Sequence, residues 1–347
     1  MTQTNATHDP ELTSWLDAEP ATGDAADFPI QNLPFGMYRA AGTEAERVGV
    51  RIRNQVIDVW ATAEAGVLSS VEEDELLDVA TQACAAPTLN ALMSLDAEVV
   101  SALRRALVAA LDARADVAVR ERVIHHDLED VELALPVDIG DYTDFYCSID
   151  HARNVGSLFR PDNPLLPNYK HLPIGYHGRA SSVVLSGTPV RRPRGLVKTP
   201  DATAPTYRPT ARLDYELEVG FFVGAGNAVG APIAIEDAEG QIFGYCLVND
   251  WSARDVQAFE YQPLGPFLAK SFLTSMSPWI VTTEALAPFR VPARERAAED
   301  PQPAPHLDTE SVRSRGGLDL VLDVSLASAR MRDEGVEPMR LSRGNFR

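Results

Sequence analysis

Short runs of β-branched and aromatic residues mark the chain just after residue 30. FGMYRA, RVGVRI and QVIDVW fall between residues 31 and 60 and are separated by turn-rich pieces. This pattern is typical of short paired strands, and it predicts a small barrel or sheet. The preceding residues 1–30 are polar, and we expect them to form a lead-in to that sheet.

Two amphipathic segments follow the predicted sheet. Ser70 and Glu73 have the spacing of a capping box, and the segment VEEDELLDVATQ that contains Glu73 is expected to continue as a helix. A second helix is predicted over about 89–113. Its apolar residues recur at spacings of three and four, namely Leu92, Leu95, Val99, Leu103 and Leu107. We expect both helices to pack on the N-terminal sheet.

The pattern of apolar and polar residues changes after about residue 118, where alternating or apolar runs are interrupted by Pro and Gly. These runs are SSVVLSGTPV, DYELEVGFFVG, IFGYCLVND, PWIVT and LDLVLDVSL. They predict a mostly antiparallel β domain, so we expect domains at 1–118 and 119–347. Residues 287–310 are rich in Pro, Ala and charge and predict an exposed loop.

Charge and cysteine content narrow the classes of protein. The formal net charge of −19 disfavours nucleic acid as a partner, and the basic stretch RRPRGLVK is short and lacks aromatic residues for base stacking. Cys84, Cys147 and Cys246 are few and far apart, which indicates a reducing compartment. The start lacks signal-peptide features, and no long apolar run predicts a membrane span. We therefore expect a cytoplasmic protein that acts on a small molecule.

Carboxylates alternate along the segment RLDYELEVGFFVG. In a strand, Asp214, Glu216 and Glu218 would share one face, opposite an apolar face of Leu213, Tyr215, Leu217 and Val219. The ordinary interpretation is a half-buried strand with a solvated acidic side. The alternative is a divalent-cation site, because neighbouring carboxylates near a core repel one another unless a cation neutralises them.

A second acidic position ends the apolar run CLVND. Asp250 is expected at a strand end, and Ser252 is expected to start a helix, although either residue could simply be a helix cap. Arg254, Gln257 and Tyr261 follow at helical spacing and form one polar face, which by itself is also compatible with a solvated surface.

Lysine is rare in this chain, and Lys170, Lys198 and Lys270 are its only examples among 31 basic residues. Lys270 lies within GPFLAKSFLTSM, where a lysine either extends to solvent or is buried against carboxylates. We favour burial, with Thr274 as a further oxygen ligand nearby. Oxygen donors without paired His or Cys indicate Mg²⁺ or Ca²⁺ rather than zinc. The chain has no G-x-S-x-G or H-E-x-x-H motif, and nothing supports Cys147 as a nucleophile.

Long motifs resemble the fumarylacetoacetate hydrolase family from about residue 27 to the end. They are DFPIQNLPFG, DYTDFYCSIDHARNVGSLFR, LLPNYKHLPIGYHGRASSVVLSGTPVRRPRG, LDYELEVGFFVG, NDWSARDVQAFEYQPLGPFLAKSF and LSRGNF. The resemblance implies a mainly β fold with some α: an N-terminal SH3-like barrel with helices and a C-terminal β-roll. It also implies a homodimer that uses Ca²⁺ and/or Mg²⁺ to hydrolyse a carbon–carbon bond of 4-fumarylacetoacetate, the last step of tyrosine catabolism.

The resemblance also implies residue roles. Divalent-metal carboxylates are implied at Asp144, Glu216, Glu218 and Asp250, and a second cation site at Asp250, Lys270 and Thr274. Substrate contacts are implied at Tyr146, Arg160, Gln257 and Tyr261, with Tyr176 near the site. His151 is implied as the general base, with Arg254 and Lys270 near the developing negative charge.

The family pattern continues beyond LSRGNF for several dozen residues. That segment is expected to supply the glutamate that orients the histidine, a Thr-containing loop and further strands, and we expect no upstream residue to replace them. The sequence thus leaves three functions open: hydrolysis of fumarylacetoacetate, an acylpyruvate-type hydrolase of the same superfamily, or a truncated chain that binds a cation or a partner without turnover.

Overall fold

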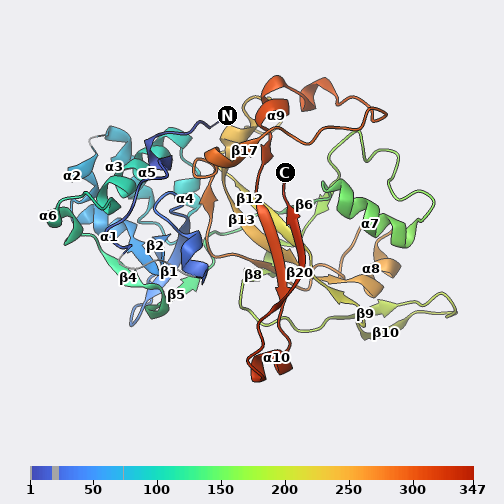
Figure 1. The fold of residues 1–347 in the computed structure, drawn as a ribbon. Coiled ribbons are helices and arrows are strands. Elements are labelled where there is room, and N and C mark those ends of the chain that lie inside the picture. The colour runs from blue at the N-terminus through green and yellow to red at the C-terminus, as the bar shows by residue number, and fades with distance from the viewer. Residues whose placement is uncertain (1, 18–22, 73) are drawn as a thin grey trace.

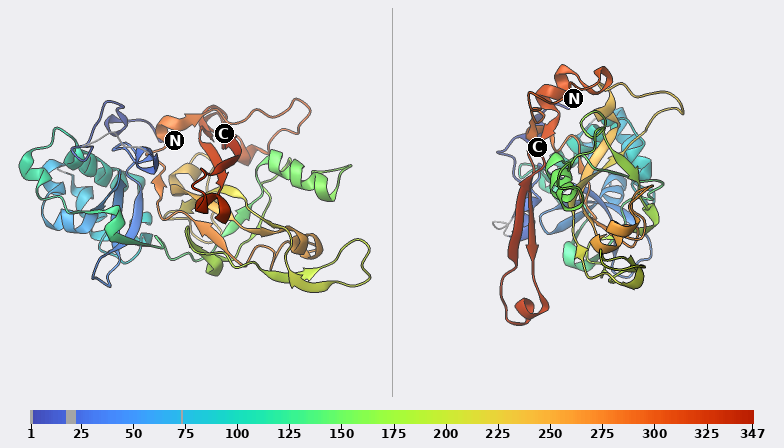
Figure 2. Two further views of the ribbon diagram at one scale, coloured as in Figure 1. Left: turned by 60° about the horizontal axis from the view of Figure 1, so that its bottom comes forward. Right: turned by 90° about the vertical axis from the view of Figure 1, so that its right-hand side faces the viewer.

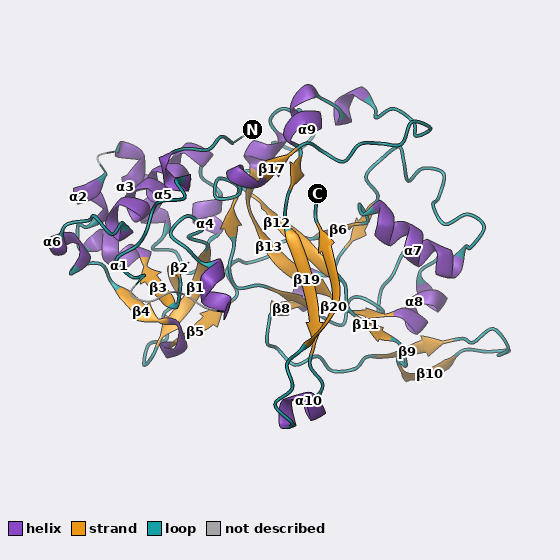
Figure 3. Cartoon of the chain, viewed as in Figure 1, coloured by secondary structure: helices purple, strands orange, loops and turns teal. Residues whose placement is uncertain are grey.

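The computed structural model describes residues 2–17, 23–72 and 74–347. An N-terminal half of sheet and helices lies beside a larger C-terminal half built mostly of strands (Figure 1). The colouring by secondary structure in Figure 3 shows that most of the helices belong to the N-terminal half. No helix in the described part of the chain is long and apolar enough to cross a membrane.

The N-terminal sheet is antiparallel, in the order β4-β3-β2-β1-β5. Its strands are β1 (Phe35–Ala40), β2 (Arg47–Ile52), β3 (Gln55–Asp58), β4 (His125–Asp127) and β5 (Val131–Ala134). The three predicted strands are thus confirmed. Because β4 and β5 come after residue 118 and complete this sheet, the N-terminal unit draws on residues up to Ala134; the division at 118/119 stays a prediction.

Helices cover the N-terminal sheet, as expected. They are α1 (Val59–Glu64), α2 (Leu68–Val71), α3 (Glu75–Ala83), α4 (Asn90–Met93), α5 (Ala97–Leu111) and α6 (Val117–Arg120). Leu92, Leu103 and Leu107 from the predicted apolar stripe are buried in the main core. That core also includes Phe243 and Ile280 of the C-terminal half.

Two helix predictions need correction. The single helix over 89–113 is wrong, because Asp96 adopts an extended backbone as the N-cap of α5 and separates it from α4. Of the predicted capping box, Ser70 lies inside α2, and Glu73 lies outside the described residues. Asp74 caps α3 instead, and its side chain accepts a hydrogen bond from the Leu76 N–H at 2.9 Å.

The C-terminal half is built around a sheet in the order β12-β13-β15-β8, with β16 also paired to β13. In chain order, the strands of this half as far as β13 are β6 (Thr143–Phe145), β7 (Gly175–His177), β8 (Val183–Leu185), β9 (Arg194–Val197), β10 (Thr206–Pro209), β11 (Leu213–Asp214), β12 (Leu217–Val223) and β13 (Ile242–Asp250). Those that follow are β14 (Ser252–Ala253), β15 (Thr274–Met276), β16 (Val281–Thr282), β17 (Arg290–Val291), β18 (Gly317–Leu318), β19 (Val321–Leu326) and β20 (Met339–Asn345). All of these pairs are antiparallel except β15 with β8, which confirms the mostly antiparallel prediction.

Four helices belong to this half: α7 (Ile149–Phe159), α8 (Arg254–Glu260), α9 (Glu310–Arg315) and α10 (Ala329–Asp333). Ser252 was expected to start a helix, but it lies in β14, and α8 begins two residues later. The short strand forms because Leu213 and Asp214 of β11 pair with it. The predicted loop over 287–310 is confirmed in outline, apart from β17 and single 3-10 turns.

The strand predicted over RLDYELEVGFFVG is interrupted. Tyr215 and Glu216 lie between β11 and β12, because β11 pairs with β14 whereas β12 pairs with β13. At this break the Asp250 N–H donates to the Glu216 carbonyl at 3.0 Å. The interruption gives Glu216 and Glu218 different surroundings, although they were expected to share a face.

The two halves meet at Phe35 and Ile280, which exchange backbone hydrogen bonds of 2.9 and 2.8 Å. The hairpin β19–β20, coloured red, extends from the body with α10 at its tip (Figure 2). Among the described residues β19 and β20 pair only with each other, and Met339 and Leu341 on β20 are exposed.

Candidate metal and active site

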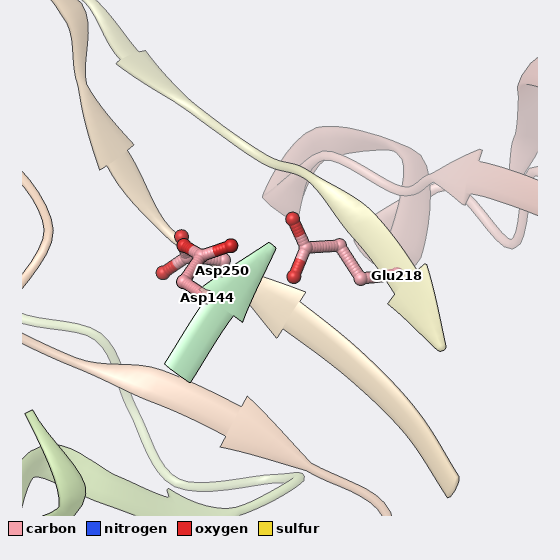
Figure 4. Close-up of side chains that lie close together, drawn as sticks. All are labelled: Asp144, Glu218 and Asp250. Atoms are coloured by element: carbon pink, nitrogen blue, oxygen red, sulfur yellow. The ribbon is translucent and has the colours of Figure 1, made fainter. Parts of the chain in front are cut away.

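Three carboxylates from three strands meet inside the C-terminal half (Figure 4). Asp144 lies on β6, Glu218 on β12 and Asp250 at the end of β13. One oxygen of each lies within 4.8 Å of the others. Asp144 and Asp250 are buried, and Glu218 is half-buried.

Strand pairing brings these acids together. Glu218 lies opposite Val248 in the β12–β13 ladder, two residues before the strand end that carries Asp250. Asp144 comes from the separate antiparallel pair β6–β7, where it lies opposite Tyr176. The prediction that Asp250 stands at a strand end is confirmed.

Mutual repulsion changes the proton affinity of this cluster. Burial and the neighbouring carboxylates raise the pKa of Glu218 to about 9. Burial likewise raises the pKa of Asp250 to about 7, with the charge of Lys270 acting in the opposite direction. Without a cation, the cluster therefore keeps at neutral pH a proton that the same carboxyl groups would release in water.

Hydroxyl groups surround the cluster. The Tyr176 hydroxyl donates to Asp144 Oδ2, and Thr274 Oγ1 donates to Asp250 Oδ1 at 3.2 Å. Burial, together with the charge of Asp144, raises the pKa of Tyr176, so its phenol stays a donor. The structure thus brings Tyr176 and Thr274 to the predicted metal carboxylates.

Glu216 has cationic neighbours instead. Its carboxylate contacts Lys270 Nζ, and its Oε1 lies 2.5 Å from Arg254 Nη2. Burial would raise the pKa of Glu216, but His151, Lys270 and Arg254 outweigh burial and lower it. Glu216 lies outside the group of three carboxylates, so its part in binding a metal stays a prediction.

Lys270 joins the two groups of acids. Its ammonium contacts Glu216 and lies 2.5 Å from Asp250 Oδ2, and its side chain is 8% exposed. Burial disfavours the charged ammonium, but the two carboxylates outweigh that effect and raise the pKa of Lys270. The predicted burial of this lysine against carboxylates is confirmed.

His151 lies in the first turn of α7, where Ser148 caps the helix by accepting from the His151 N–H. Its Nε2 lies 3.4 Å from Glu216 Oε1, and its side chain is 37% exposed. We expected no upstream residue to replace the glutamate that orients the histidine; that expectation stays a prediction, and Glu216 lies beside the ring. The break between β11 and β12 is what brings Glu216 there.

Some of the residues predicted to contact substrate lie near His151. The Tyr146 ring meets the His151 ring edge-on, with centroids 5.6 Å apart. Gln257 Oε1 accepts from Arg254 Nη1 at 3.1 Å. Arg160 Nη2 donates to the Pro164 carbonyl, and its buried Nε has no hydrogen-bond partner among the described residues. Tyr261 caps the C-terminal end of α8.

Tyr142 lies near the site and carried no predicted role. Burial and the three carboxylate charges raise the pKa of its phenol, and a Cβ at Gly178 would lie 2.2 Å from its ring. Period-two spacing could have found it, because Tyr142 is two residues before Asp144. Asp214, predicted on the acidic face, accepts through Oδ2 from Arg254 Nε at 2.8 Å.

This donor set fits a hard divalent cation. Carboxylate and hydroxyl oxygens are the ligands that Mg²⁺ and Ca²⁺ prefer, and no cysteine or second histidine completes a zinc set in the described cluster. A bound cation would replace the protons that the raised pKa values keep on Glu218 and Asp250.

Cation affinity is expected to rise with pH. The pKa of Glu218 is raised from 4.5 to about 9, so between those values the cation-free fold keeps a proton that the unfolded chain releases. Raising the pH through this window therefore destabilises the cation-free fold and removes the proton that competes with the cation. Glu216 stays ionised because its pKa is lowered.

Titration calorimetry with Mg²⁺ or Ca²⁺ at several pH values from about 6 to about 9 checks this expectation. Glu218→Gln should weaken the pH dependence, whereas Glu310→Gln, on exposed α9, should not. An affinity that stays constant across the range would contradict it.

Buried carboxylates beside a lysine, an arginine and a histidine define a metal-dependent hydrolase centre within a mixed α/β fold. Family models agree: fumarylacetoacetate (FAA) hydrolase C-terminal matches residues 141–340, and fumarylacetoacetase N-terminal matches 31–136. The chain belongs to the fumarylacetoacetate hydrolase family. These matches confirm the predicted family, fold class and enzyme class.

Several curated proteins that are similar to this chain are named fumarylacetoacetase. The fumarylacetoacetase of Bos taurus is 43% identical over 329 residues, covering 93% of this chain and 74% of its own length. That of Homo sapiens is 45% identical over 288 residues, covering 81% of this chain and 66% of its own. The chain thus spans about two thirds to three quarters of these relatives.

Among solved structures, a fumarylacetoacetate hydrolase from psychrophilic Exiguobacterium antarcticum is 18% identical with a TM-score of 0.39, covering 72% of this chain and 66% of that one. The family assignment rests on the sequence matches.

Proposed function

We propose that this chain hydrolyses the carbon–carbon bond of 4-fumarylacetoacetate to fumarate and acetoacetate. The observation that carries the proposal is that Lys270 contacts two acids at once. One is Asp250 of the Asp144–Glu218–Asp250 cluster, and the other is Glu216. The curated relatives from Bos taurus, Rattus norvegicus and Homo sapiens, each named fumarylacetoacetase, support this substrate over that of other superfamily hydrolases.

The cation would be held by the three clustered carboxylates together with Glu216, and a second cation position would lie near Asp250, Lys270 and Thr274. When bound, Mg²⁺ or Ca²⁺ supplies a Lewis acid that polarises a substrate carbonyl.

His151 is proposed to take the proton of the attacking water. Its position in the first turn of α7, close to Glu216 and partly open to solvent, supports this role. A carboxylate beside an imidazole fixes the ring orientation and favours the protonated form that results. His151 can then return the proton to the enolate carbon after the carbon–carbon bond breaks, which completes the hydrolysis.

Positive and donor groups are proposed to stabilise the negative charge that develops. Lys270, Arg254 and Gln257 lie together through their contacts with Glu216 and with one another. Fixed charges in a buried site stabilise an oxyanion and then an enolate without reorganising. Lys270 and Arg254 would thus take part in the reaction in addition to neutralising the charge of Glu216.

A substrate carboxylate is proposed to bind Arg160, Tyr146 and Tyr261. The partnerless buried Nε of Arg160 supports this role, because a guanidinium offers paired N–H donors to a carboxylate. Burial also raises the pKa of Tyr146, which keeps its phenol a donor.

Incubation of the 347-residue chain with 4-fumarylacetoacetate and Mg²⁺ or Ca²⁺ tests the function, with release of fumarate as the measurement. We expect turnover that a chelator abolishes and that exceeds the turnover of an acylpyruvate. A better kcat/KM for the acylpyruvate would favour the other superfamily activity. A cooperative melt without any turnover would favour the cation-binding chain without catalysis.

We further propose a homodimer in the cytoplasm. The apolar side chains exposed on the β19–β20 hairpin are consistent with a second copy as a neighbour. Light scattering measures the oligomeric state.

A further inference from the structure

Helix α8 binds the loop that precedes Lys270 at both of its ends. Before the helix, the Ala253 N–H donates to the Ala269 carbonyl at 2.9 Å. At its last residue, Glu260 Oε1 accepts from the Ala269 N–H at 2.7 Å and from the Phe267 N–H at 2.9 Å. The residue before Lys270 is therefore hydrogen-bonded to α8 through both its carbonyl and its N–H.

Packing leaves this residue little freedom. Ala269 is fully buried and forms a small apolar cluster with Ala253, Val256 and Val197. The chain then turns tightly, because the N–H groups of Lys270 and Ser271 both donate to the Phe267 carbonyl, at 3.0 and 2.7 Å. The direction in which the Lys270 side chain leaves the backbone thus depends on how Phe267 and Ala269 are held.

We propose that Glu260 is a positioning residue for the reaction. Its carboxylate fixes the 267–270 turn against α8, so that Lys270 is presented to Glu216 and Asp250 from the same rigid unit that carries Arg254 and Gln257. Hydrogen bonds to an ionised acceptor are stronger than neutral ones, and one oxygen satisfies two N–H groups. The Glu260 carboxylate acts through the turn that it binds, and the inference rests on the proposed role of Lys270.

Lysine labelling tests this without turnover, because the chain contains only Lys170, Lys198 and Lys270. Reductive methylation followed by mass spectrometry gives a rate for each amine. In the wild-type chain Lys270 should be protected and exposed Lys198 should react freely. Glu260→Ala should raise the Lys270 rate relative to Lys198 by roughly tenfold, because two charge-assisted hydrogen bonds that hold the turn closed are lost.

Glu260→Gln separates hydrogen bonding from charge. The amide oxygen still accepts both N–H bonds, so Lys270 should stay close to wild-type protection. Asp255→Ala is the matched control, because Asp255 lies on the same helix and accepts the Ala211 N–H at 2.9 Å, away from the Lys270 turn. Equal exposure of Lys270 in Asp255→Ala would overturn the proposal, as would exposure in Glu260→Gln equal to that in Glu260→Ala.

Buried Cys246 on β13 reports general unfolding of this half. Its thiol should stay unreactive in Glu260→Ala, and simultaneous exposure of Cys246 and Lys270 would show a purely structural role and overturn the proposal. If Glu260→Ala does not fold, amide hydrogen exchange of the wild-type chain decides. The Phe267 and Ala269 amides should be as protected as those of α8, and rapid exchange would overturn the inference.

Activity adds a separate measurement. With 4-fumarylacetoacetate and Mg²⁺, Glu260→Ala should lower kcat with little change in KM, and Glu260→Gln should restore it. Absence of turnover in the wild-type chain would count against the proposed function alone, since the labelling result still decides the role of Glu260.

Discussion

Replacement of His151 by alanine is expected to lower kcat by roughly 100- to 10,000-fold, the usual contribution of a general base. The imidazole is the group beside Glu216 that can take a proton from water, and the first turn of α7 holds it there. Cation affinity should be unchanged, because His151 lies outside the carboxylate cluster. Steady-state kinetics of fumarate release and titration calorimetry measure the two properties.

His306→Ala is the control for this substitution, since His306 lies in a 3-10 turn of the exposed 287–310 loop. It should keep wild-type kcat. Wild-type turnover in His151→Ala would show that another group activates the water. Loss of cation binding together with turnover would instead place His151 among the metal ligands.

Replacement of Lys270 by methionine is expected to lower the free energy of unfolding by about 3–5 kcal/mol at neutral pH, as for other buried pairs that lose one partner. Lys270 is the cation that contacts Glu216 and Asp250 together, so its loss leaves buried charge uncompensated. Urea unfolding measures the change. The loss should shrink as the pH falls, because Asp250, whose pKa is already raised, then takes up a proton.

Lys198→Met, on an exposed loop, is the matched control and should leave stability close to wild type. Wild-type stability of Lys270→Met would mean that the acids around it are protonated or otherwise neutralised in the folded chain. A bound divalent cation should partly restore the stability of the variant, because it neutralises Asp250 in place of the ammonium.

Local patterns predicted the site elements with mixed success. The apolar run into Asp250 correctly indicated a strand end, and the rarity of lysine correctly singled out Lys270. The single helix over 89–113 was wrong, because spacing of apolar residues does not reveal the extended backbone at Asp96. Ser252 was expected to start a helix, because the sequence does not distinguish a serine that caps a helix from a serine in a short paired strand.

The partners of the carboxylates depended on distant segments. Alternation placed Glu216 and Glu218 on one face, yet the break at residues 215 and 216 directs Glu216 to Lys270 and Arg254. Glu218 instead faces Asp144 and Asp250. Tyr176 reaches Asp144 through the pairing of β6 with β7, which brings together residues 32 positions apart.

By itself the sequence determined the kinds of group available: several acids, one lysine expected to be buried, a histidine and a long resemblance to one family. Residue type and local periodicity carry that information, because side-chain chemistry and backbone preference are properties of short segments. Only the tertiary structure decided which acid lies beside His151, which three carboxylates form the cluster, and that Glu260 accepts hydrogen bonds from the turn before Lys270. Those contacts join strands and loops far apart in the chain, and the pairing that creates them is settled by packing over the whole C-terminal half.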